Sequence, residues 1–377
     1  MAAAADTAPA NPPPADRPFI WTCAVAVVLA SGFGGFLGFF VRSGALTKPL
    51  SDFIVFWTAA RFPMARIYDV QALTEAQRWY IPFLGQLRPF PYPPSFLPWI
   101  APFGHMPFVL SGVLWVLLSA ALYLAAARLL ARGPAMLIAA ATRPVLEAAF
   151  DGQSVLLAGA FLIGGVASLR KRPLLAGALL AVAATIKPQM TLMAPLVLIS
   201  GRHWRAFGAA MATGLAIGAA SLLTQGVDVW FAWIRMDRDL LPVLGTGDVL
   251  HFGVTPYLTG SPALTALGAL LGVACAWIGG RSDKPHLTLA GLAVGALLCS
   301  PYALMYDLVT LVPAAAIMLL DRKAHPVVWL AAGLLLSGFG GAYAVLAFGV
   351  VLIWHAWPGV MDRGRKDQPR QPERVSL

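Results

Sequence analysis

The stretch FIWTCAVAVVLASGFGGFLGFFV, residues 19–41, runs for 23 residues without a charged side chain. A transmembrane helix needs about 20 predominantly apolar residues to cross roughly 30 Å of hydrocarbon. The run is too long for the apolar core of a signal peptide, and Arg17 is the nearest preceding cation. It therefore predicts an uncleaved first span. The alanine- and proline-rich N-terminus at 1–18 is predicted to be disordered and cytoplasmic.

Similar apolar runs recur along the whole chain. Hydrophobic residues make up 59% of the sequence, charged residues only 12%, and the mean hydropathy is +0.73. A soluble domain carries about 25% charged residues. The composition predicts an all-α polytopic membrane bundle with about 10–12 transmembrane helices. The candidate spans are 19–41, 107–131, 134–150, 153–169, 173–186, 189–200, 206–224, 262–279, 287–299, 301–320, 326–336 and 338–357.

The cations are distributed unevenly among the connections. The connections between successive spans form two alternating sets. One set holds the basic clusters at 128–132, 170–172, 202–205, 281–284 and 322–323, and the basic tail at 358–377. The other set consists of hinges at 151–153, 187–189, 300–302 and 337–341, with Lys187 as their single cation. The positive-inside rule places the basic set and both termini in the cytoplasm. A single membrane domain is thus predicted at 19–357.

Two long connections, 42–106 and 225–261, are predicted to lie outside the cytoplasm. Both are rich in aromatic residues and proline, and prolines rule out a regular spanning helix over 88–107. A short interfacial or re-entrant helix is expected at 95–104. Several neighbouring spans are short, and irregular backbone at membrane depth is tolerated only where it is buried or lines a cavity. The hinges are therefore expected to surround a recessed vestibule.

The net charge of +10 belongs to this topology and to contact with anionic lipid, so it does not indicate a nucleic-acid partner. Cys23, Cys275 and Cys299 lie within apolar runs without ligand spacing. Neither a disulfide framework nor a metal site nor a cofactor is predicted.

The stretch SDFIVFWTAAR, residues 51–61, places a lone carboxylate, Asp52, before a stripe of aromatic residues. Phe53, Phe56, Trp57 and Ala60 follow helical spacing, which predicts an amphipathic helix at the outer interface. Asp52 has two possible roles that do not exclude each other, the N-cap of this helix and a catalytic base.

Further polar residues lie at the outer hinges. Arg143, Glu147 and Asp151 share one helical face, which suits either a buried ion pair or a functional site. Asp151 and Gln153 are candidates for contacting a polar ligand.

Two more hinges contribute candidate site residues. Lys187 is either a phosphate-binding ammonium or a snorkelling lysine. Gln189 lies in the same hinge. Tyr302 suits an interfacial aromatic belt as well as a site, and Asp307 follows its hinge into an apolar run.

Several of these motifs occur in the order seen in one family of membrane enzymes. SDFIVFWTAAR, IYD at 67–69, YPPSFLPWIAPFGHMPF from Tyr92, DGQSVLLAG from Asp151, ATIKPQM from Ala184 and SPYALMYDLVTLVP from Ser300 resemble glycosyltransferase family 87 over roughly residues 19–355. Members belong to the GT-C class, and the chain resembles their polyprenyl-phosphate-mannose-dependent α-1,2-mannosyltransferases.

The resemblance implies a GT-C fold with its active site facing the periplasm of a bacterial inner membrane. The partners would be a polyprenyl-phosphate-linked sugar donor and a glycolipid or glycan acceptor. The family's loop aspartate, a general base, matches Asp52, and its other motifs match Tyr92, Gln153 and Lys187.

An inverting transfer also needs a cation or dipole at the departing phosphate, which Lys187 with Arg61 or Arg66 would supply. No metal is required. The alternatives are an ion-coupled transporter or lipid flippase using Arg143, Glu147 and Asp307, and a non-catalytic scaffold.

Overall fold

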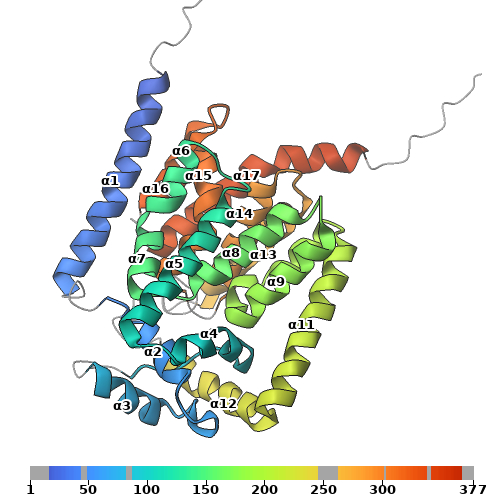
Figure 1. The fold of residues 1–377 in the computed structure, drawn as a ribbon. Helices are drawn as coiled ribbons and strands as arrows, with labels where there is room; N and C mark the ends of the chain where they lie inside the picture. The colour runs from blue at the N-terminus through green and yellow to red at the C-terminus, as the bar shows by residue number, and fades with distance from the viewer. Residues whose placement is uncertain are drawn as a thin grey trace, which may run out of the picture.

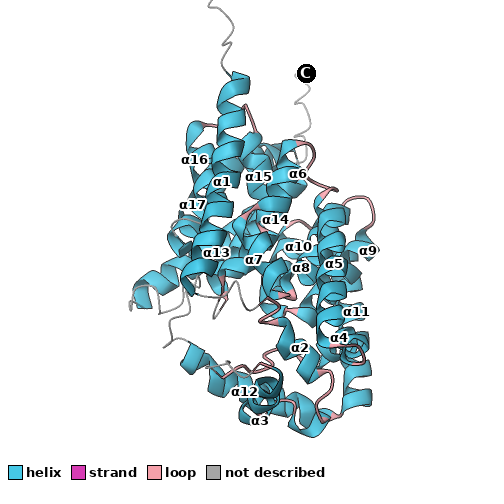
Figure 2. Ribbon diagram, turned by 60° about the vertical axis from the view of Figure 1, so that its left-hand side comes forward, coloured by secondary structure: helices cyan, strands magenta, loops and turns pink. Residues whose placement is uncertain are grey.

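A computed structural model describes residues 17–43, 49–81, 87–244, 262–300, 303–337 and 341–366. Every regular element within these ranges is a helix, which confirms the predicted all-α membrane bundle (Figure 2). The bundle helices are α1 (Arg17–Ser43), α5 (Phe108–Ala127), α6 (Pro134–Ala141), α7 (Arg143–Asp151), α8 (Val155–Ser168), α9 (Pro173–Ile186), α10 (Ala194–Ser200), α11 (Trp204–Gln225), α13 (Pro262–Arg281), α14 (Pro285–Cys299), α15 (Val312–Leu320), α16 (Pro326–Ser337) and α17 (Gly341–Lys366).

Three described segments are long and apolar enough to span a membrane by themselves, namely Phe108–Ala127, Trp204–Gln225 and Tyr343–Met361. Most predicted spans match a helix to within a few residues, but at the spans predicted at 189–200 and 301–320 the α-helix begins only at Ala194 and Val312. Helix α17 passes through Pro358 and ends at Lys366, beyond the predicted end of the membrane domain at 357. The predicted N-terminal tail lies outside the described residues except for its last two, and so does the end of the basic tail from 367.

The predicted span at 134–150 is wrong as a single helix. The chain forms α6 and then α7, with Thr142 in an extended conformation between them. Pro144 lies in the first turn of α7. Within a continuous helix its ring would clash with the carbonyl four residues earlier, whereas in a first turn it is tolerated. The bundle therefore has a break where α1 packs against α6 and α7.

The centre of the bundle depends on close helix packing. Helix α8 lies against α5 and α9, α9 lies against α11, and α13 lies against α14. At Gly279 an added Cβ would lie 2.9 Å from the Cα of Gly291, so α13 and α14 meet backbone to backbone. Small residues allow this approach, which suits a bundle whose surroundings are as apolar as its core.

The two long connections meet at one end of the molecule. The first forms α2 (Phe53–Ala59), η2 (Met64–Arg66), α3 (Val70–Tyr80), η3 (Pro94–Phe96) and α4 (Leu97–Gly104), and the second begins with α12 (Val227–Leu244). Helix α12 contacts η2 and η3. In Figure 1 these elements lie together below the bundle, whereas α1 begins at the opposite end. The short helix expected at 95–104 is confirmed.

The expectation for α2 is wrong in one respect. The helix forms, but all its side chains are buried, including Ile54, Val55 and Thr58, which lie outside the predicted stripe. Helix α2 is therefore a core element packed on α3, α4 and α5 and not an amphipathic helix at an interface. The residue before it, Asp52, is held against the bundle.

Candidate active site

The backbone preceding α2 is bonded to the end of α7. The Leu50 amide donates to the Phe150 carbonyl at 2.9 Å, and the Asp52 amide donates to the Asp151 carbonyl at 3.0 Å. Leu50 takes a positive φ of 61°, a conformation that is uncommon outside glycine. These contacts place the Asp52 side chain beside the hinge between α7 and α8.

Two side chains from distant parts of the sequence contact the Asp52 carboxylate. Arg88 Nη1 lies 2.9 Å from Oδ1, and Gln153 Nε2 donates to Oδ2. The Asp52 side chain makes no capping bond to α2. The structure therefore does not favour the role of Asp52 as N-cap of α2. About a quarter of the side chain stays exposed, 26% for Asp52 and 28% for Arg88, which leaves the carboxylate accessible.

Gln153 reaches Asp52 because the hinge turns sharply. Gly152 follows α7 in the left-handed conformation, with φ 70°. An added Cβ there would lie 2.7 Å from the Phe53 Cβ, so only glycine fits without displacement. Tyr92 then orients the amide, because its hydroxyl donates to Gln153 Oε1 at 3.3 Å and accepts from Ser154 Oγ at 3.1 Å. Three segments thus meet at Asp52.

Arg88 is the site residue that the sequence does not reveal. Its amide donates to Thr74 Oγ1 at 3.0 Å, and its carbonyl accepts from Gln77 Nε2 at 2.9 Å. Both partners are buried residues of α3. Helix α3 therefore positions Arg88, which also donates to the Ser51 carbonyl at 2.5 Å. No sequence signal distinguished it from the other arginines of this connection.

Asp151 belongs to the same cluster. It is the last residue of α7, just beyond the span predicted at 134–150, and Ser51 Oγ donates to its Oδ1 at 3.1 Å. Loss of solvation by burial, and next the nearby Asp52 charge, raise the pKa of Asp151 to about 8, although the Ser51 hydrogen bond opposes this shift. Asp52, Asp151, Gln153 and Tyr92, four of the predicted site residues, are thereby brought together.

A second polar cluster connects two other hinges. Lys187 Nζ donates to Asp307 Oδ1, with the two side chains only 5% and 3% exposed. The ammonium also lies 4.9 Å from the centre of the Tyr306 ring. Gln189 and Asp307 border a cavity of about 10 Å³, roughly the space of one water molecule. Tyr302 lies outside the described residues.

The remaining predicted cations lie elsewhere. Arg61 donates to the Gly104 carbonyl at 2.9 Å and stacks over the Trp57 ring at 4.5 Å. Arg66 pairs with Asp69 at 3.1 Å, and its side chain is 61% exposed. The structure does not bring either of them to Asp52. Within the bundle, Arg143 and Glu147 form the buried ion pair that the sequence allowed, with Nε and Oε1 2.6 Å apart.

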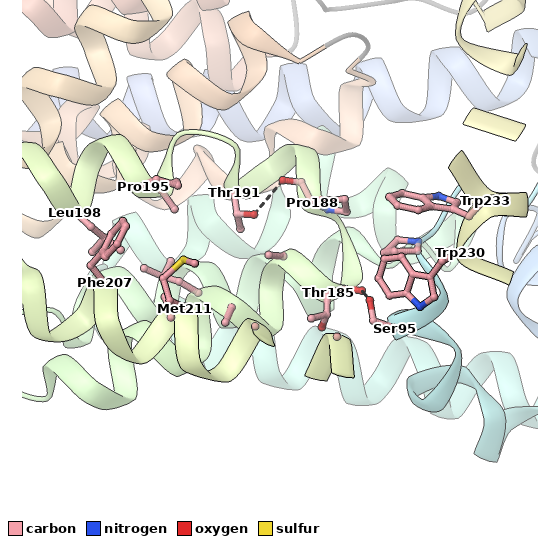
Figure 3. A pocket seen from close by; sticks show the side chains of 18 residues that line it. Ser95, Thr185, Pro188, Thr191, Pro195, Leu198, Phe207, Met211, Trp230 and Trp233 are labelled. Carbon is pink, nitrogen blue, oxygen red and sulfur yellow. Dashed lines mark hydrogen bonds between the residues drawn. The ribbon is translucent and has the colours of Figure 1, made fainter. Parts of the chain in front are cut away.

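A cavity of about 340 Å³ extends from the connection elements along α11 (Figure 3). Leu198, Phe207 and Met211 lie at one end, and Ser95, Thr185, Trp230 and Trp233 gather at the other. Its lining is mostly apolar. Ser95 Oγ donates to the Thr185 carbonyl at 3.1 Å, so the polar end is tied to the segment that carries Tyr92 and to the one that carries Lys187.

No group of three or more His, Cys, Asp or Glu side chains in the described part of the chain could hold a metal ion. No curated protein and no solved structure matches the sequence. The profile of glycosyltransferase family 87 matches residues 90–301, more than half of the chain, including Tyr92, Gln153 and Lys187. Asp52 and Arg88 precede the matched region and are joined to it by the contacts described above. The match favours the transferase over the transporter and scaffold alternatives, and the chain belongs to glycosyltransferase family 87.

Proposed function

We propose that the chain transfers a mannose-like hexose from a polyprenyl-phosphate donor to a lipid or glycan acceptor, with inversion at the sugar and with Asp52 as general base. One observation carries this proposal. The Asp52 carboxylate is held by Arg88 and Gln153 at the end of the bundle where the two long connections meet. Family membership supports glycosyl transfer, and the resemblance to mannosyltransferases supports the donor class.

The proposed reaction uses few protein groups. The acceptor hydroxyl oxygen attacks the anomeric carbon while Asp52 takes the hydroxyl proton. The bond between the anomeric carbon and the phosphate oxygen breaks, and the departing polyprenyl phosphate keeps the electron pair. Each carboxylate oxygen has two lone pairs, so Asp52 can accept from the substrate while it stays bonded to Arg88 and Gln153. Those two bonds fix its direction, which proximity catalysis requires.

The departing phosphate is assigned to Lys187. An ammonium has three donors, and the bond to Asp307 uses one. Pro188, the next residue, lines the large cavity, while the Lys187 side chain itself is buried against Asp307. The proposed roles of Gln189 and Asp307 in substrate binding belong to this cluster, and a role for Tyr302 stays a prediction. Arg61 and Arg66 have other partners, and the structure gives neither a contact that supports phosphate binding.

The large cavity suits the apolar tail of the donor. It is long and mostly apolar, and Ser95, Thr185, Trp230 and Trp233 gather at one end of it (Figure 3). An amphiphile would place its tail along α11 and leave its head at the connection elements, where Ser95 and Thr185 lie. The cation distribution supports a periplasmic position of this end in a bacterial inner membrane.

The test is transfer by the purified protein from a panel of polyprenyl-phosphate sugars, with nucleotide sugars as comparison donors. We expect transfer from a polyprenyl-phosphate hexose and its loss in Asp52→Asn. Transfer from nucleotide sugars alone would overturn the donor class. Transfer that is equal in wild type and Asp52→Asn would overturn the role of Asp52.

A further inference from the structure

The Asp52 cluster contains more carboxyl groups than cations. Asp52 and Asp151 are joined through the Asp52 amide and through Ser51, and Arg88 is the cation that contacts Asp52. Glu147, one helical turn before Asp151, already has Arg143 as its partner. Two neighbouring carboxylates in a half-buried site, of which only Asp52 contacts the Arg88 guanidinium, repel each other, so one of them is favoured in its neutral form.

We propose that Asp151 is a positioning residue that works as a neutral carboxylic acid beside the Asp52 carboxylate, so that Arg88 stays with Asp52. This inference rests on the proposed function of Asp52 as the base. It assigns different protonation states to two neighbouring carboxyl groups through their surroundings. Asp52 has a cation and an amide donor, whereas Asp151 receives one neutral hydroxyl donor, Ser51.

The electrostatics support the assignment. Burial and the Asp52 charge are the two largest influences that raise the pKa of Asp151, to about 8, and the Glu147 charge acts in the same direction. The Ser51 hydrogen bond and the Arg88 charge act against them. A carboxyl with a raised pKa is neutral below it, so Asp151 is mostly neutral at pH 7 and becomes ionised as the pH rises through 8.

Among the described side chains, the other elements packed on α7 supply no further counter-charge. Helix η5 (Met305–Thr310) brings Asp307, which is bonded to Lys187. Helices α6 and α8 contain no charged residue, and α1 has none among its described side chains. Helix α5 contributes Tyr123, whose hydroxyl donates to the Ala139 carbonyl at 3.2 Å.

The consequence is an alkaline limit on turnover. Above pH 8 an ionised Asp151 would place a second negative charge beside Asp52 and compete with it for Arg88. Asparagine at position 151 cannot ionise and retains an acceptor for the Ser51 hydroxyl. Asp151→Asn is therefore expected to lower turnover only a few-fold at pH 7, and to remove the alkaline limit near pH 8.

The first experiment measures transfer between pH 6 and 10 for wild type, Asp151→Asn and Asp69→Asn. Asp69 is an exposed aspartate of the same connection that caps α3 and pairs with Arg66, so it is a matched control. We expect turnover to fall above about pH 8 in wild type and in Asp69→Asn. In Asp151→Asn this alkaline limit should move upward by at least about one pH unit. A limit that is unchanged in Asp151→Asn would overturn the proposal.

A second measurement does not depend on transfer or on the folding of Asp151→Asn. Infrared difference spectra between pH 6 and 10 follow the C=O stretch of a protonated carboxyl in wild type and in Asp52→Asn. We expect a carboxyl that titrates near pH 8 in wild type, with a lower midpoint in Asp52→Asn because the neighbouring charge has gone. If no carboxyl titrates in this range, or if the midpoint is the same in both proteins, the proposal is wrong. The spectra can be measured even if no donor is found. Failure of this proposal can therefore be distinguished from failure of the proposed function.

Discussion

Replacing Asp52 by asparagine tests the proposed base with little change in shape. Asparagine keeps one acceptor oxygen and one amide donor, so one of the two contacts with Arg88 and Gln153 is retained. The contact that is lost involves a carboxylate with 26% exposure, and partly exposed ion pairs of this kind stabilise by about 1 kcal/mol or less. The melting temperature should therefore fall by only a few degrees.

The expected loss of activity is much larger. A general base contributes roughly 10²- to 10⁴-fold to turnover, which corresponds to about 2.7–5.4 kcal/mol of activation free energy at about 1.36 kcal/mol per factor of ten. The barrier thus rises several times more than the folding free energy changes. A role as helix cap predicts the opposite pattern, because asparagine caps as well as aspartate and the structure shows no capping bond.

The assay is single-turnover transfer from a polyprenyl-phosphate hexose, measured per folded protein in detergent. Asp69→Asn is the matched control, since Asp69 caps α3 through the Ala72 amide and has an arginine partner of its own. It should transfer at a rate within about twofold of wild type. A rate for Asp52→Asn within about tenfold of wild type would refute the reasoning, because a missing base cannot cost so little.

Three further substitutions test the rest of the site. Lys187→Met should lose about 3–5 kcal/mol of stability, measured by thermal melts, because it leaves the Asp307 carboxylate buried without its cation. Adding Asp307→Asn should restore stability but not donor affinity. If the double variant binds donor as tightly as wild type, Lys187 is not part of the site. Gly152→Ala should destabilise by roughly 1–2 kcal/mol or more, read from melting curves, because the residue has φ 70°; an unchanged melting curve would contradict the observed hinge. Gly214→Leu should raise the apparent KM for long-chain donors about tenfold, the effect of about 1.4 kcal/mol of crowding in the cavity, and should spare short-chain donors. Gly208→Leu on the same helix, with open space around it and outside the cavity, is the control, and equal effects of the two would argue against a tail site.

The sequence predicts the bundle well because lipid imposes a simple requirement on each span. An apolar run must satisfy its own backbone, so its length and its bounding charges indicate a helix directly. The break at Thr142 is missed because hydropathy averages over Pro144. The burial of α2 is missed because the prediction followed one stripe, although Ile54 and Val55 on the other side are equally apolar.

The site is predictable only in part. Asp52, Tyr92 and Gln153 are found through ordered motifs, and the structure brings them together. Arg88 differs from Arg61 and Arg66 in no local feature of the sequence. It is selected by tertiary contacts. Its amide donates to Thr74 and its carbonyl accepts from Gln77, and this positions its guanidinium on Asp52, 36 positions earlier in the chain. Single-sequence patterns carry no information on such contacts.

The contacts of Asp52 also bear on where the functional unit begins. The family match starts at residue 90, yet the backbone at 50–52 is hydrogen-bonded to the end of α7. Phe53 also packs so closely on Gly152 that a larger residue at 152 would clash with it. Trp115 then ties the hinge to α5, since its indole nitrogen donates to the Gly152 carbonyl at 2.9 Å. A catalytic group must be held to within about 0.5 Å, which rigid elements achieve better than loops. Because α2 is buried on all sides, the segment that carries Asp52 behaves as part of the core. A fragment that starts at the matched region would lose both the proposed base and Phe53, which packs against Gly152.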